Sequence, residues 1–387
     1  MMLLRTKRHT SHDIIRTVAV AVTALVLFSC QNDDFMDNIN SNKVTIHPVI
    51  SRAIETTVQT RALAGYSEDT IRQQALSVNA VAFDSLNARA IANDIQGLFA
   101  PVSTGWRSTV EVEPSYKYNL YTYSRVMPTA TTPQFSYDSE SNVSLTFTGL
   151  DIITENDPLV GVAVAGAVIS NNNPAPSQYP DLTKGQFSIG KIPSSEVDGT
   201  SFKAFLALDH LYSKATLSFR VDNKYIYEVR IKDIQIKTDH NTLSGSHKYK
   251  FYSQNLELEK NNNSQYVVNG NAKGINLFDG PTATAQPEEG DNYIALTTSY
   301  REFGYYYFLP LPPVPSMYLE VTYDIYDNVG KILVRENQTA RNGNLFSTIS
   351  DNGNAAAGTN YKIKILVSPT YLYQLSDDLE LGLTIEQ

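Results

Sequence analysis

The run ATLSFRV at residues 215–221 gives the clearest indication of the fold. Ala215, Leu217, Phe219 and Val221 alternate with polar residues, so that one face of an extended chain is apolar. A period of two is typical of a β-strand that buries one side and exposes the other. We therefore predict a strand here and look for the same pattern on either side of it.

Runs with similar patterns occur along most of the chain. We predict further strands at residues 44–50, 77–84, 108–112, 118–123, 144–148, 160–168, 229–237, 318–326, 331–336, 361–367, 371–375 and 379–385. The alternation slips by one residue within 229–237, which predicts a bulge, and residues 327–330 predict a hairpin turn. Residues 88–98 are expected to form a short helix or an irregular insertion.

Length and composition agree with a β-rich protein. The chain has 387 residues, enough for about two domains, and 24 tyrosines against one tryptophan. Many short strands with few helical patterns predict an all-β fold made of β-sandwiches. We place a domain boundary near residue 200.

The first 30 residues resemble the leader of a bacterial lipoprotein. A basic segment up to Arg16 is followed by the apolar run 17–28, the layout of a secretory signal. The sequence Leu27-Phe28-Ser29-Cys30 is similar to a lipobox, and Cys30 is the only cysteine of the chain. We therefore expect residues 1–29 to be a signal peptide and Cys30 to carry lipid, with no intrachain disulfide.

The charge of the chain argues against two classes of partner. The formal net charge is −9, and the net +3 of the signal peptide leaves −12 for the chain from Cys30 onward. Nucleic acids and anionic lipid surfaces are bound mainly through basic patches. No nucleic-acid partner is expected.

Several segments, taken in order, resemble the fimbrillin family of the Bacteroidales. The segments that carry the resemblance are AVAFD at 80–84, LDHL at 208–211, KATLSF at 214–219, VTYDIYDNVG at 321–330 and GTNYKIKI at 358–365. Together with the lipoprotein leader they cover nearly the whole chain. The end of the chain, residues 379–387, lacks the aromatic ending of many relatives.

This resemblance implies a two-domain architecture. It implies two tandem transthyretin-like β-sandwich domains, at 62–199 and 200–387, after a leader at 30–61 that contains the first strand. It also implies export to the outer membrane as a lipoprotein and assembly with other fimbrial subunits at the cell surface, contributing to adhesion.

The resemblance further implies cleavage after an arginine by a surface protease, which removes the first strand. The leader holds two Arg-Ala bonds. Our first choice is Arg61-Ala62, and Arg52-Ala53 is the alternative. The strand removed would be 44–50, where Pro48 favours an edge position. The strand that replaces it in the next subunit would come from the C-terminal region.

Other functions stay open at this stage. One is a fimbrial tip, an anchor, or a stand-alone lipoprotein that binds glycans or a host or bacterial receptor. Trp106 and residues 305–307, three tyrosines, could stack on sugars, although strand aromatics more often belong to a core. A secreted hydrolase with an unrecognised site is the last alternative.

No motif for catalysis, for a metal or for a cofactor is found in the sequence. Nucleophile elbows, Walker loops and dinucleotide fingerprints are absent. His240 and His247 flank the predicted turn 241–245, have no ligand-like spacing and are expected to be solvated. We therefore expect a protein that is not an enzyme and holds neither a metal ion nor a cofactor.

Overall fold

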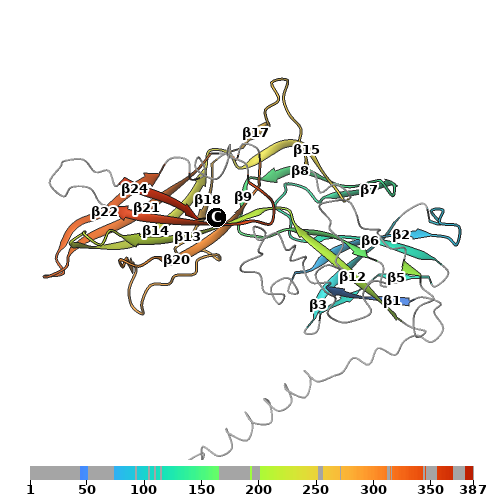
Figure 1. Ribbon diagram of the computed structural model, residues 1–387, viewed down its shortest axis with the longest axis horizontal. Coiled ribbons are helices and arrows are strands. Elements are labelled where there is room, and N and C mark those ends of the chain that lie inside the picture. Colours follow the sequence, from blue (N-terminus) through green and yellow to red (C-terminus); the bar gives the residue numbers. More distant parts are fainter. Residues whose placement is uncertain are drawn as a thin grey trace, which may run out of the picture. The chain divides into compact units, whose positions relative to one another are not determined.

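The described part of the chain is built from β-strands. The computed structural model describes residues 44–50, 74–164, 192–193, 201–368 and 380–386, apart from gaps at 92–93, 103–104, 109, 114–115, 252–255, 271, 312–313, 315, 343–344 and 346–354. Every regular element within these ranges is a strand, which confirms the all-β prediction (Figure 1). No helix in the same ranges is long and apolar enough to span a membrane.

The strands form four sheets, which we name A to D. Sheet A contains β1 (Val44–Ile50), β2 (Leu76–Phe83), β3 (Ile95–Val102), β4 (Gly105–Ser108), β5 (Glu111–Val112), β6 (Lys117–Ser124), β10 (Leu159–Val164), β11 (Ile192–Pro193) and β12 (Ser201–His210). Sheet B contains β7 (Gln134–Ser139), β8 (Asn142–Asp151), β15 (Thr242–Lys250), β16 (Leu256–Glu257) and β17 (Val268–Asn269).

Sheets C and D hold most of the second half. Sheet C contains β9 (Ile153–Thr154), β13 (Ser213–Val221), β20 (Arg301–Phe308), β23 (Asn360–Ser368) and β24 (Glu380–Glu386). Sheet D contains β14 (Tyr227–Thr238), β18 (Lys273–Asn276), β19 (Ile294–Ala295), β21 (Met317–Asp327) and β22 (Leu333–Asn342).

Sheets C and D enclose one apolar core. The predicted inner face of β13 is confirmed, because Ala215, Leu217, Phe219 and Val221 are all buried there. The inner residues of β14 and β21 belong to the same core. The predicted bulge in β14 is also confirmed, since its register against β21 shifts between Ile231 and Asp233. The extra residue lets the apolar residues on both sides of the bulge point inward.

A second core lies between sheets A and B. Tyr121 of β6 packs on Phe135 of β7 and on Phe251 after β15, with ring centroids 5.2 and 5.1 Å apart. Val81 and Phe83 join them from β2. Because successive residues of a strand point to opposite faces, the same strands also supply a third core.

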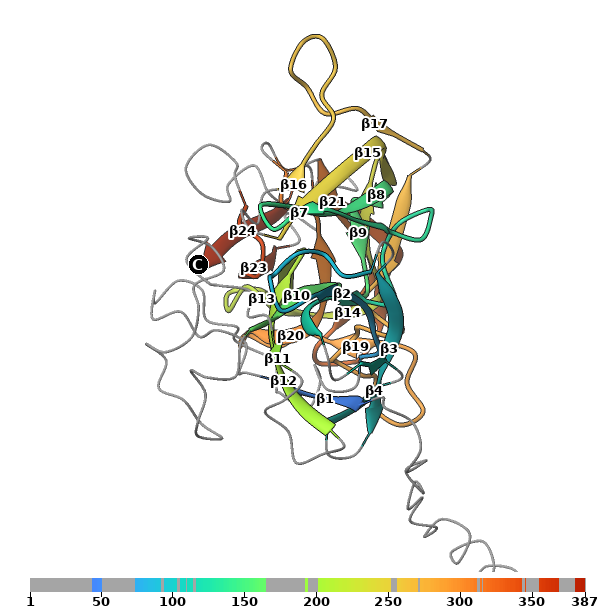
Figure 2. The ribbon, with the colours of Figure 1, turned by 90° about the vertical axis from the view of Figure 1, so that its right-hand side faces the viewer.

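The third core lies on the other face of sheet A. It contains Leu76, Val78 and Ala80 of β2, which alternate with the residues of the second core, together with Phe99 and Trp106. β1 contacts β4 as well as its ladder partner β12 (Figure 2). Strands at the two ends of the sheet A order therefore approach each other, which helps to close this core.

Sheet membership crosses residue 200 in both directions. β12 begins at Ser201 but belongs to sheet A, whereas β15 to β17 belong to sheet B beside β8. Conversely, β9 lies before residue 200 in the sequence but pairs with β20 in sheet C. The residues from Lys43 to Gln387 form one compact unit. The division into two domains at residue 200 stays a prediction.

The prediction for residues 88–98 is correct only in part, since residues 88–91 are irregular apart from an isolated bridge at Arg89. Residues 88–98 were expected to be helical or irregular, but their end is the start of β3, which pairs with β2. Its burial is incomplete and it contains Gly97 and Pro101, so no clear alternation marks it in the sequence.

Candidate assembly site

The first described strand, β1, is held mainly by one neighbour. It runs parallel to β12, in register from Thr45 opposite Ser201 to Ile50 opposite Leu206. On its other side β5 pairs with only two residues, Val44 and Thr45. Pro48 lies outside this short ladder and is in register only with Ala204 of β12 among the described strands.

β12 depends on β1 for half of its length. Its residues 201–206 pair with β1, and its residues 205–210 pair with β10. Within the described ranges, residues 201–204 therefore have β1 as their only ladder partner. Loss of β1 would expose a row of backbone N–H and C=O groups on β12, which is a template for another strand.

The last described strand, β24, lies at the opposite end of the chain and at the end of sheet C. Its seven residues pair antiparallel with β23, from Glu380 opposite Ser368 to Glu386 opposite Lys362. Positions 381, 383 and 385 lie opposite Val367, Ile365 and Ile363 of β23, which are fully buried. The apolar positions of β24 are therefore in register with buried positions of β23.

A buried ion pair joins the segments where the chain passes between sheets A and C. His210 ends β12 just before β13, and Asp157 lies between β9 and β10. The His210 Nδ1 and Asp157 Oδ2 atoms are 2.7 Å apart, with side chains only 6% and 4% exposed. Burial alone would lower the pKa of His210, but the charge and hydrogen bond of Asp157 outweigh it and raise that pKa.

The loop before β23 packs against the same histidine. Gly358 has a φ of +71°, and a Cβ there would lie 3.6 Å from His210 Cδ2. Its N–H donates to the carbonyl of Tyr212, and the Ser213 hydroxyl donates to the carbonyl of Ala356. The start of β13, the end of β12 and the approach to β23 therefore meet at His210.

The aromatic residues considered for sugar stacking belong to the cores. Trp106 is 4% exposed, and its Nε1–H donates to the carbonyl of Gln74 at 2.8 Å. Tyr306 and Tyr307 are also buried, while Tyr305 is half-buried with the Lys214 ammonium 4.0 Å from its ring centroid. These side chains offer no exposed aromatic platform, so the sugar-stacking role predicted for them has no support.

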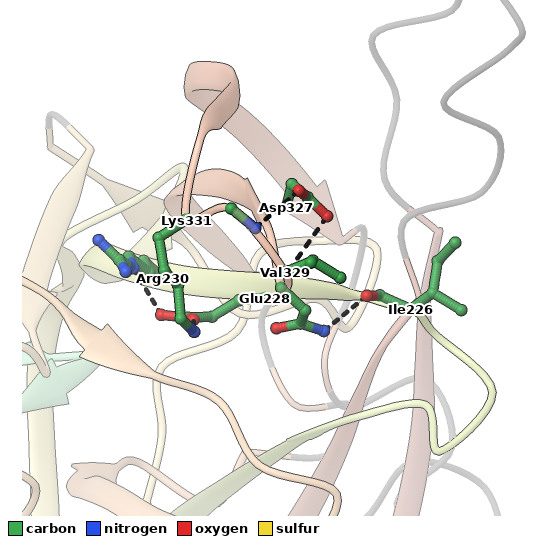
Figure 3. Close-up of polar contacts among 8 residues, drawn as sticks. Ile226, Glu228, Arg230, Asp327, Val329 and Lys331 are labelled. Atoms are coloured by element: carbon green, nitrogen blue, oxygen red, sulfur yellow. Dashed lines mark hydrogen bonds and ion pairs between the residues drawn. The ribbon is translucent and has the colours of Figure 1, made fainter.

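The acidic sequence at 324–330 forms the predicted hairpin between β21 and β22. Asp327 accepts hydrogen bonds from the N–H groups of Val329 and Gly330, which closes the turn (Figure 3). The Asn328 amide donates to the carbonyl of Ile226 at 2.5 Å. The oxygens of Asp327 therefore serve the turn, as asparagine and aspartate commonly do.

The same hairpin lies beside a cluster of ion pairs and near exposed apolar side chains. Glu228 is bound by both Arg230 and Lys331, and these contacts lower its pKa although burial alone would raise it (Figure 3). Ile226 and Val329 nevertheless stay 71% and 94% exposed. Single exposed apolar residues are common on protein surfaces and need no partner.

His247 departs from its prediction. It was expected in a solvated loop, but it lies within β15 and is 1% exposed. Burial lowers its pKa, so the ring favours the neutral form. No group of three or more histidines, cysteines, aspartates or glutamates in the described ranges is placed to hold a metal ion.

The predicted modification sites lie outside the described residues. This applies to Cys30 and to the two Arg-Ala bonds, Arg52-Ala53 and Arg61-Ala62. It also applies to the polar run at 171–179. The part of the assembly site that the structure describes consists of β1, β12, β5, β23 and β24.

Comparisons with known proteins find similarity only among solved structures. No family model and no curated protein matches the chain. A fimbrial protein from Bacteroides vulgatus is similar over 89% of this chain and 98% of its own, with 12% identity and a TM-score of 0.46. The fimbrial anchor protein Mfa2 from Porphyromonas gingivalis matches 89% of this chain and 96% of its own, with 10% identity and a TM-score of 0.30.

Proposed function

We propose that this chain is a structural subunit of a cell-surface fimbria that assembles by strand exchange and contributes to adhesion. The observation that carries the proposal is the pairing of β1, which leaves residues 201–204 of β12 without a described neighbour when β1 is removed. A strand from another subunit would restore the ladder, as in β-augmentation. Repeated head-to-tail, this contact does not close and produces a filament.

The C-terminal strand is suited to be the replacement. β1 and β24 both contain seven residues, and every second position of each is apolar. In β1 the register pairs Ile46, Pro48 and Ile50 with Phe202, Ala204 and Leu206 of β12. Leu381, Leu383 and Ile385 provide the same spacing of apolar positions in β24. A strand from the region 371–387 of one subunit would then fill the place of β1 in the next.

The proposal includes maturation before assembly. Residues 1–29 direct export, Cys30 receives lipid at the outer membrane, and cleavage after Arg61, or after Arg52, releases the leader with β1. The mature subunit then holds two transthyretin-like sandwiches, at 62–199 and 200–387. Its partners are other fimbrial subunits, and no catalytic residue is assigned to it.

Treatment of the purified chain with an arginine-specific protease tests this proposal. We expect a new N-terminus at Ala62 by mass spectrometry, followed by ladders that resist SDS on gels. Arg61→Ala should prevent both, whereas Arg52→Ala, the matched control, should leave both unchanged. If Arg52→Ala is the variant that prevents them, the alternative bond is the processing site.

Two outcomes would count against the proposal. Cleavage that leaves a stable monomer at high concentration would contradict strand exchange. A surface form that still begins at a lipidated Cys30 would contradict release of the leader and would favour an anchor or a stand-alone binding lipoprotein. The N-terminus of the native surface protein separates these cases.

A further inference from the structure

A polar cavity lies at a corner of sheet A that sheet B does not cover. Ser77 of β2 is opposite Leu98 of β3 and Tyr123 of β6, so the three form one row across the sheet. In the next row Tyr121 is fully buried under the rings of sheet B, whereas Tyr123 is only half-buried. The cavity beside the first row measures about 730 Å³.

The opposite wall of this cavity is a loop that is attached to sheet B. Residues 125–133 follow β6, and Thr129 forms a bridge with Leu150 of β8. The N–H of Asp151 donates to the carbonyl of Pro128 at 2.7 Å, and Thr131 Oγ1 donates to the carbonyl of Thr148 at 3.5 Å. Both walls are therefore held by backbone pairing, and the cavity exists before any ligand binds.

The lining carries groups that bind hydroxyl-rich ligands. Ser77, Gln96, Thr129, Thr131 and Thr132 supply hydroxyl and amide groups, and Tyr123 and Leu98 supply apolar surface. Small-molecule sites of roughly 300–1,000 Å³ combine apolar surface with a few placed polar groups in this way. A saccharide presents both hydroxyl groups and apolar ring faces.

Arg125 adds a positive charge to one side of the cavity. Its backbone N–H donates to the carbonyl of Ala75, but its guanidinium forms no ion pair with a described residue. Burial and the carboxylate of Asp94 raise the pKa of Tyr123, so a ligand carboxylate would bind at Arg125 and away from the Tyr123 hydroxyl. A guanidinium can bind a carboxylate through two parallel hydrogen bonds.

We infer that this cavity is a binding site for an acidic saccharide, with the sugar carboxylate on Arg125 and its hydroxyl groups on the threonines and Gln96. The site lies on β2, β3, β6 and the 125–133 loop, and none of its residues belongs to β1, β12 or β24. The inference is therefore independent of strand exchange. The protein would then bind acidic saccharides in addition to other subunits.

Binding of defined oligosaccharides to the purified chain tests the inference. Saturation-transfer NMR with 3′-sialyllactose and with digalacturonate should give signals from the sugar protons, and titration calorimetry should give an affinity for each. Lactose serves as the neutral control, and an acidic tripeptide of glutamate tests the alternative that the site takes a protein segment. We expect binding of the acidic sugars only.

Two variants locate the binding. Arg125→Gln removes a charged hydrogen bond and should weaken binding about tenfold or more. Thr132→Trp should block the exposed mouth and abolish binding, while Arg301→Gln, at an exposed arginine outside the cavity, should leave the affinity unchanged. Unchanged melting temperatures would show that all three variants are folded.

The other outcomes overturn the inference. Lactose binding as tightly as 3′-sialyllactose would contradict the role of Arg125 as a carboxylate site. Binding of the tripeptide alone, or no binding of either acidic sugar, would contradict a saccharide site altogether. Acidic sugars that bind equally well to Arg125→Gln and Thr132→Trp would place the site elsewhere on the chain.

Discussion

Strands β1 and β13 both run parallel to a strand far along the chain, but they differ in their surroundings. β13 pairs with β23 from Lys214 to Val221 and with β20 on its other side from Ser213 to Phe219. β1 pairs with β12 from Thr45 to Ile50, and only Val44 and Thr45 pair with β5. Within the described ranges, β1 is therefore paired along only one edge for most of its length, and β13 is paired on both edges.

Under the proposed strand exchange, this difference separates the strand to be exchanged from one that has to stay in place. Removal of β13 would divide sheet C and take Leu217 and Phe219 out of its core. Removal of β1 would take one strand from near the end of the sheet A order and leave β2, β6, β10 and β12 paired with one another. A subunit that assembles by strand exchange needs one strand of each kind.

The largest effect is expected from removing β1. A chain of residues 62–387 should melt at a lower temperature than a chain of residues 43–387, because residues 201–204 lose their ladder partner. A synthetic peptide of residues 43–51 should restore the melting temperature. At a concentration a hundred times its Kd, it should raise the free energy of unfolding by about 2.7 kcal/mol.

Calorimetry with the two chains and the peptide measures this effect. A peptide with the same composition in scrambled order is the control and should have no effect. Equal melting temperatures for the two chains, with no response to the peptide, would remove the distinction between β1 and β13.

An intermediate effect is expected from trimming a side chain of β13. Leu217 is fully buried in the core between sheets C and D, so Leu217→Ala should lower the free energy of unfolding by about 2–5 kcal/mol. Ser218→Ala, on the outer face of the same strand, should change it by about 0.5 kcal/mol or less.

Urea denaturation of both variants provides the measurement. Equal costs for Leu217→Ala and Ser218→Ala would mean that β13 does not form the centre of its core.

The smallest effect is expected from the pH dependence of His210, which lies between β12 and β13. The raised pKa of His210 means that its stabilising charge is fully present below the unfolded value of about 6.5 and is lost as the pH rises through the folded pKa. Asp157, Asp209 and Lys214 are the charged groups that act on it. Stability should therefore fall as the solution becomes alkaline.

Melting temperatures between pH 5 and pH 9 test this dependence. His210→Asn should flatten the decline, and His240→Asn, at an exposed histidine, should leave it unchanged. His247 should change the stability in the opposite direction. Because burial lowers its pKa, the folded protein loses stability as the pH falls below about 6.5. A decline that persists in His210→Asn would assign it to other groups.

Some features of the strands could be predicted from the sequence and others could not. The alternation in β13, the bulge in β14 and the hairpin between β21 and β22 were predicted, because each depends on residues adjacent along the chain. β3 was missed because its burial is partial. The burial of His247 was missed because one polar residue in a strand can point to either face.

The sequence by itself predicted most of the strands, and it holds the two Arg-Ala bonds of the segment that is expected to be a leader. The tertiary structure decided which strands lie side by side: β1 with β12, β13 with β23, and the loop at 125–133 above Ser77 and Tyr123. The reason is physical. A period of two records only which face of a strand is apolar, whereas pairing joins residues that are more than a hundred positions apart and depends on which edges remain free after the cores close.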